Sequence, residues 1–276
     1  MMADRSTLFA KHATFESKRF RAWAHASSVP EDVAVWLEEP EKLQAGRDRS
    51  SSGRAIFVKR HARSSWKRIA DRIGGRPSPS RRAFFTGLVL ESAGVSAVRP
   101  LAAIESRTGG LSFTILEHLD GPDLGRYLVA GLEGSEPSER RALKSRTWRE
   151  LAGLVAKLHA AGVRQRDLKA PNILVPLESS SSRAVLVDLE GMRFVGRLPS
   201  ARARMRDLAR LATSLRAPDV RDAGVERGDI EELVSLYLEA IRPFAGSVRE
   251  ASWVKTIFGW AEKKEERNRR AGRPLR

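Results

Sequence analysis

The spacing of apolar residues in this 276-residue chain changes near residue 120, and this change constrains the fold more than any other feature. Before it, short stretches are β-prone and surround one helix whose apolar face includes Phe84 and Leu88. After it, apolar residues recur at helical intervals. The expected strands are 54–59, 98–104 and 111–116, and the expected later helices are 147–161, 201–215, 229–241 and 250–264. The pattern predicts an α+β, two-lobed fold with a β-rich first lobe and a mainly α-helical second lobe.

We divide the chain accordingly into three parts. Residues 1–40 are expected to form an N-terminal extension with a short helix, in which Val33, Trp36 and Leu37 share one face. Residues 41–118 are expected to form the N-lobe, and residues 119–276 the C-lobe.

Composition excludes several kinds of function. The chain has no cysteine, which excludes disulfides, thiolate metal sites and a cysteine nucleophile. Fifty lysines and arginines against 34 acidic residues give a net charge of +16, which favours an anionic partner. No recognised nucleic-acid motif accompanies the charge, so a basic nucleic-acid binder is a less favoured alternative and no nucleic acid is expected. Without a signal-like start or an apolar run of 18 residues, we expect a soluble cytoplasmic protein.

The densest group of polar residues lies at 163–175, which read VRQRDLKAPNILV. Sixteen residues past Asn172, the apolar stretch VLV ends in Asp188. This arrangement suits phosphoryl transfer, in which one carboxylate positions the attacking hydroxyl. An amide oxygen and a second carboxylate can then hold Mg²⁺ against the nucleotide phosphates.

The pattern D-L-K-x-x-N followed by an apolar strand and Asp resembles the protein-kinase-like fold. The segments RQRDLKAPNILV, VDLEGMRF and RMRDLARLATSL resemble the lipopolysaccharide kinase (Kdo/WaaP) family of bacteria. The resemblance covers roughly residues 40–245. The resemblance implies ATP and Mg²⁺ as cofactors. It implies catalytic roles for Asp167 and Lys169 and metal binding by Asn172 and Asp188. It implies nucleotide binding by Lys59 and by the backbone at Glu117 and Leu119. It also implies that Asp207 supports the catalytic loop through hydrogen bonds to the loop backbone.

The chain departs from the protein-kinase pattern in four places. Gln165 stands where the pattern has His, which we expect to weaken a packing and hydrogen-bond contact. Glu190 replaces the Gly of D-F-G, and no glycine-rich loop precedes Lys59. Glu91 is a weak candidate for the glutamate that would pair with Lys59 and is expected to be a solvated helix residue. A pseudokinase that binds without turnover therefore remains an alternative.

The acceptor is expected to be a sugar hydroxyl rather than a peptide. Asp207 follows Asp188 by 19 positions, and no peptide-anchoring A-P-E segment lies between them. The interval and the helix after it hold arginines suited to phosphates and carboxylates, namely Arg193, Arg197, Arg202, Arg204 and Arg206. The resemblance implies an anionic lipid A–core glycolipid as acceptor, phosphorylated on Kdo or heptose. Another small molecule or a protein remains an alternative acceptor.

The C-terminal part suggests a second anionic contact. Trp253, Ile257 and Trp260 share a helix face, and residues 263–276 are strongly basic. Such a stripe can lie on an anionic bilayer, which predicts a cytoplasmic protein docked peripherally on the inner membrane. The alternative is a helix packed on the second lobe.

Overall fold

The computed structural model describes residues 12–62, 77–108, 110–176 and 184–272. Contacts divide the chain into two compact units, residues 1–93 with 97–119, and residues 94–96 with 120–276. The first holds a β-sheet with its helices and the second is mainly helical, so the predicted α+β fold class is confirmed.

The first unit is built on an antiparallel sheet with the strand order β1-β2-β5-β6-β4-β3. Its strands are β1 (His12–Glu16), β2 (Phe20–His25), β3 (Gly46–Arg49), β4 (Ala55–Ala62), β5 (Pro100–Ser106) and β6 (Leu111–Glu117). Residues 12–38, within the segment 1–40 expected to be an extension, instead contribute β1, β2 and helix α2 (Pro30–Glu38) to this unit. The reason is that β2 pairs with β5 and buries Phe20, Ala22 and Ala24 in the core.

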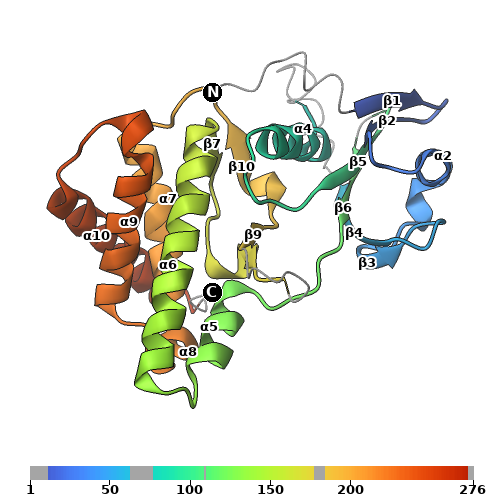
Figure 1. Ribbon diagram of the computed structural model, residues 1–276. Coiled ribbons are helices and arrows are strands. Elements are labelled where there is room, and N and C mark those ends of the chain that lie inside the picture. Colours follow the sequence, from blue (N-terminus) through green and yellow to red (C-terminus); the bar gives the residue numbers. More distant parts are fainter. Residues whose placement is uncertain (1–11, 63–76, 109, 177–183, 273–276) are drawn as a thin grey trace. The chain divides into compact units, whose positions relative to one another are not determined.

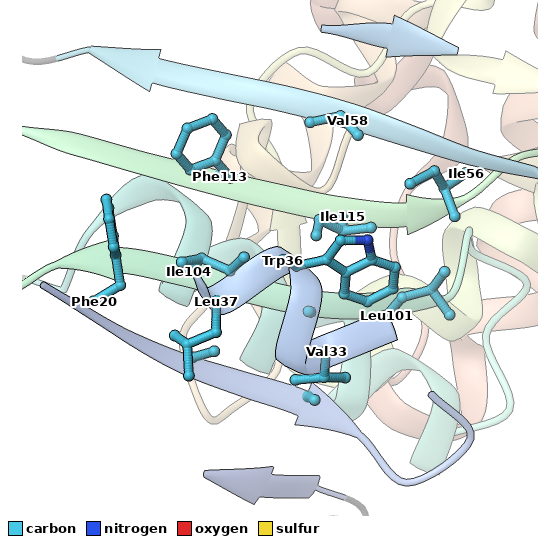
Figure 2. Packing of buried hydrophobic residues seen from close by; sticks show 13 residues of the cluster. Phe20, Val33, Trp36, Leu37, Ile56, Val58, Leu101, Ile104, Phe113 and Ile115 are labelled. Atoms are coloured by element: carbon cyan, nitrogen blue, oxygen red, sulfur yellow. The ribbon is translucent and has the colours of Figure 1, made fainter. Parts of the chain in front are cut away.

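The two faces of the sheet carry different helices, because side chains alternate along each strand. On one face, Val33, Trp36 and Leu37 of α2 pack on residues of β2, β4, β5 and β6, as Figure 2 shows. On the other face, Trp23 and Ala103 pack against helix α4 (Pro79–Ser92) through Phe84 and Leu88.

The turn between β3 and β4 is tied to α2 by a buried carboxylate. Asp32, only 1% exposed, accepts hydrogen bonds from Ser51 Oγ, from the Ser52 N–H at 2.8 Å and from Ser52 Oγ at 2.7 Å. Burial alone would raise the pKa of this carboxyl, but the serine hydrogen bonds together outweigh burial and hold the pKa below its ordinary value. The serine-rich turn is therefore a fixed feature of this unit.

The four later helices expected from the sequence are present as α6 (Pro137–Ala160), α7 (Ala201–Leu215), α9 (Arg227–Ala245) and α10 (Glu250–Arg270). The second unit also contains α5 (Leu124–Leu132) and the short α8 (Pro218–Asp222), which were not expected. Figure 1 shows α6 and α9 side by side, and these helices pack together. Strands β8 (Ile173–Leu174) and β9 (Val185–Leu186) form a two-stranded hairpin, and residues 177–183 between them lie outside the described residues.

Helix α10 packs on the second unit rather than presenting an apolar stripe. Trp253 and Ile257 are buried, and the Trp253 ring lies 6.1 Å from that of Tyr237 in α9. Of the two interpretations of this segment, the packed helix is therefore confirmed, and Trp253 and Ile257 do not form a membrane-facing stripe. In the described parts of the chain, no helix is long and apolar enough to cross a bilayer.

Candidate active site

The predicted catalytic loop follows strand β7 (Val163–Gln165) and ends in the short 3-10 helix η2 (Ala170–Asn172). Lys169 Nζ lies 2.8 Å from Asp167 Oδ2, so the two predicted catalytic side chains form an ion pair. Asn172 Nδ2 donates to the Asp167 carbonyl oxygen at 2.8 Å and lies 3.3 Å from Asp167 Oδ2. These contacts close the loop on itself and leave the Asp167 side chain 46% exposed.

The β8–β9 hairpin brings Asn172 and Asp188 to the same end of a two-stranded sheet. Ile173 pairs with Leu186, and one step further the Val187 N–H donates to the Asn172 carbonyl at 3.1 Å. Asp188 is the next residue, so residues 16 positions apart become neighbours. Their side chains offer an amide oxygen and a carboxylate, the hard oxygen ligands that Mg²⁺ prefers.

Gln165 connects the catalytic loop to Asp188. Its side chain is fully buried, donates from Nε2 to the Asp188 carbonyl at 2.7 Å and accepts the Asp167 N–H at 3.1 Å. The expectation that glutamine weakens this contact is wrong, because its amide has both a donor and an acceptor and uses each once.

A glycine that the sequence reasoning overlooked makes this connection possible. After Asp188 the chain forms the 3-10 helix η3 (Leu189–Gly191), so Gly191 stands one position beyond the expected turn glycine. A Cβ on Gly191 would overlap Gln165 Oε1 and lie 2.9 Å from Asp188 Oδ2. Its carbonyl also accepts the Arg166 N–H at 3.0 Å. The backbone at residue 191 is therefore packed directly against both side chains.

Helix α7 supports the loop through two side chains on one face, seven residues apart. Asp207 is fully buried and accepts from Arg164 Nη2 at 3.0 Å and from Arg210 Nη1 at 3.2 Å. These bonds go to side chains, whereas Asp207 was expected to bond the loop backbone. The backbone bond comes from Ser214, whose Oγ accepts the Ala170 N–H at 2.8 Å. The sequence reasoning missed Ser214, although its spacing from Asp207 places both on one helix face.

The predicted nucleotide-binding residues all belong to the first unit. Lys59 lies in β4 opposite Thr114, on the sheet face opposite to Ile56 and Val58. Alternation therefore places Lys59 on the face that α4 covers.

Glu117 and Glu91 both have partners within the first unit. Glu117 ends β6, its N–H donates to the Arg99 carbonyl at 2.9 Å, and its side chain pairs with Arg54 at 2.9 Å. Leu119 is the last residue of this unit. Glu91 is not the solvated residue expected, since its Oε2 lies 3.0 Å from His25 Nε2.

A β-sheet unit bearing a strand lysine, followed by a helical unit with this loop and hairpin, defines a protein-kinase-like phosphotransferase. Comparison with protein families agrees with this class. The sequence model of the "Lipopolysaccharide kinase (Kdo/WaaP) family" matches residues 35–237, and the chain belongs to that family. Its members are kinases, so the predicted enzyme class is confirmed at the level of the family.

Individual proteins also resemble the chain. A solved structure titled "WaaP in complex with acyl carrier protein" aligns with a TM-score of 0.59 over 87% of this chain and 97% of that chain. At 23% identity, this likeness establishes the fold alone. A curated protein of Oryza sativa subsp. japonica, named "Putative cyclin-dependent kinase F-2", is 39% identical over 74 residues. That match spans 26% of this chain and 22% of the rice protein.

Proposed function

We propose that the protein transfers the γ-phosphoryl group of ATP to a sugar hydroxyl of the lipopolysaccharide inner core, on Kdo or heptose. The observation that carries the proposal is the convergence of Asp167, Lys169 and Asn172 with Asp188 at one end of the β8–β9 hairpin. Family membership supports the lipopolysaccharide core as acceptor.

In this proposal Asp167 accepts the proton of the acceptor hydroxyl. The hydroxyl oxygen then forms a bond to the γ-phosphorus, the bond to the bridging oxygen breaks, and ADP leaves. Lys169, held 2.8 Å from Asp167, offsets negative charge on the transferring group. The remaining exposure of Asp167 gives an acceptor access to its carboxylate.

The residues present fit a magnesium ion. Because Asn172 donates its Nδ2 hydrogen to the Asp167 carbonyl, its Oδ1 atom is the oxygen available for a cation beside the Asp188 carboxylate. Mg²⁺ usually completes its shell with water and substrate phosphate oxygens, and it supplies charge neutralisation for phosphoryl transfer. Gln165 would hold the backbone of both metal-site segments in place.

In the first unit we assign Lys59 to the α- and β-phosphates. The backbone from Glu117 to Leu119 is assigned to the adenine base. The Glu117 side chain is already paired with Arg54 and Arg99, which agrees with a role through the backbone alone.

Transfer of radiolabelled phosphate from ATP to a Kdo–lipid A acceptor tests the proposal. We expect labelled glycolipid with the natural sequence and a rate at least about a thousandfold lower with Asp167→Ala, since loss of a catalytic group costs several powers of ten. Asp222→Ala, which removes a carboxylate that is 69% exposed, is the matched control and should leave the rate unchanged. Binding of Mg²⁺–ATP without consumption across a panel of acceptors would instead establish a pseudokinase.

We further propose that the reaction takes place at the cytoplasmic face of the inner membrane. The net charge of +16 supports long-range attraction to anionic lipids, worth about 1 kcal/mol for each cation near the surface. Flotation with acidic and neutral liposomes tests this proposal. Equal binding to both, or no binding at low salt, would contradict it.

A further inference from the structure

Helices α7 and α10 line an open, strongly basic hollow in the second unit. Its volume is about 320 Å³, within the range of about 300–1,000 Å³ typical of small-molecule pockets. Ala209 and Trp260 line it together with six cations, which are Arg202, Arg206, Arg210, Lys263, Lys264 and Arg267. The lining contains no acidic residue. Two of the arginines predicted to recognise an acceptor are therefore here, whereas Arg204 is buried against Trp253.

The positive charge of this hollow is largely unneutralised by the protein. Arg210 pairs with Asp207, but within the described residues the other five cations have no carboxylate within 4 Å. The nearby glutamates of α10 pair elsewhere, Glu265 with Arg216 at 3.0 Å and Glu266 with Arg270 at 2.7 Å. Gathering like charges costs stability, and a bound anion removes that cost.

The hollow lies close to the catalytic loop. Arg210 shares the Asp207 carboxylate with Arg164, the residue that precedes Gln165. Burial lowers the pKa of the Lys264 ammonium, Arg210 and Lys169 lower it further, and Asp167 opposes them. Lys264 is therefore within electrostatic range of both predicted catalytic side chains.

We propose that this hollow binds the anionic part of the acceptor, which is a sugar carrying phosphate or carboxylate groups. The bound group would lie beside the acceptor hydroxyl whose proton Asp167 accepts. The assignment rests on the proposed function, because it places the acceptor of that reaction. Arginine forks and lysine ammonium groups bind phosphate and carboxylate oxygens through charge-assisted hydrogen bonds. The indole of Trp260, with Arg206 stacked 5.7 Å from its ring centre, gives the hollow an aromatic wall for the sugar ring.

Calorimetric titration without nucleotide tests the site separately from catalysis. The probe is the deacylated, bisphosphorylated lipid A saccharide carrying Kdo, compared with the same saccharide after dephosphorylation and carboxyl reduction. The variant Arg206→Gln, Lys264→Gln, Arg267→Gln should raise the dissociation constant at least about 30-fold, as expected for loss of several charge-assisted bonds. The uncharged saccharide should bind much more weakly to the natural protein.

The matched control removes three exposed cations from the same unit, Arg242→Gln, Arg249→Gln and Lys255→Gln. Its dissociation constant should change less than about threefold, since screened distant charges contribute little. Equal losses in both variants, or none in the first, would overturn the assignment. The assignment would also be overturned if the triple variant at Arg206, Lys264 and Arg267 bound the saccharide normally but lost affinity for an acidic protein, because the hollow would then be a protein-binding surface.

Phosphate transfer separates the two proposals. If the first variant phosphorylates Kdo–lipid A with unchanged kcat/KM, the hollow is not the acceptor site and the proposed function stands. If the saccharide binds through the three cations but is never phosphorylated, the proposed function fails and anion binding stands.

Discussion

The side-chain amide of the buried Gln165 donates a hydrogen bond of 2.7 Å to the backbone carbonyl of Asp188. The same amide accepts the Asp167 N–H, so one side chain fixes the spacing between the predicted base and the predicted metal ligand. Neither bond needs the imidazole found at this position in the protein-kinase pattern.

Replacing Gln165 should impair turnover more than nucleotide binding. Gln165→Met keeps the side-chain length and removes both bonds, so we expect kcat to fall about 10- to 100-fold, as is usual when a partner supporting metal ligands is lost. The KM for ATP should change little. Gln165→His can donate to the same carbonyl and should recover most of the rate, whereas a merely structural role would lower stability without this recovery.

Adding a methyl group at Gly191 should displace the same connection. The new Cβ would overlap Gln165 Oε1, so Gly191→Ala should destabilise the protein by about 1–3 kcal/mol, as expected when buried polar groups lose their partners. Urea unfolding measures this change. Gly153→Ala is the control, because its Cβ would meet nothing within 4 Å in a helix, where alanine is favoured by about 0.5–1 kcal/mol.

Asp32 should contribute stability that depends on pH. Its folded pKa is lower than the ordinary value of 3.8, so its contribution is complete above that value and is lost as pH falls through the folded pKa. Asp32→Asn should cost about 1–2 kcal/mol at pH 7 and progressively less below pH 4. Urea unfolding across this range, with the exposed Asp222→Asn as control, measures the difference. A cost that does not depend on pH would contradict the assignment.

Removing the charge of Asp207 should destabilise the second unit. Asp207→Asn leaves Arg164 and Arg210 without their buried carboxylate, for which we expect a loss of about 2–4 kcal/mol. Thermal and urea unfolding measure it, and the exposed Glu239→Gln serves as control. If Asp207→Asn unfolds like the natural protein, Asp207 does not support the loop.

Much of the fold could be predicted from the sequence, because the spacing of apolar residues and the short motifs depend only on residues close together in the chain. The change from alternating to helical spacing predicted a β-rich unit followed by a helical unit. The motif alone predicted Asn172 and Asp188 as partners. The segment 1–40 was misjudged, since its pairing partner β5 lies about 80 residues further along the chain. Pairing across such a separation leaves little trace in local composition.

In the site, too, some features could be predicted from residues close together in the sequence, and others depend on contacts between distant residues. The sequence by itself determined which residues are predicted to carry the chemistry and their order along the chain. Only the tertiary structure decided that Gln165 contacts Asp188, that Ser214 rather than Asp207 bonds the loop backbone, and that Trp253 is buried. It also decided that cations from α7 and α10 share one hollow. These outcomes depend on which helix faces meet, and that is set by packing between residues distant in sequence.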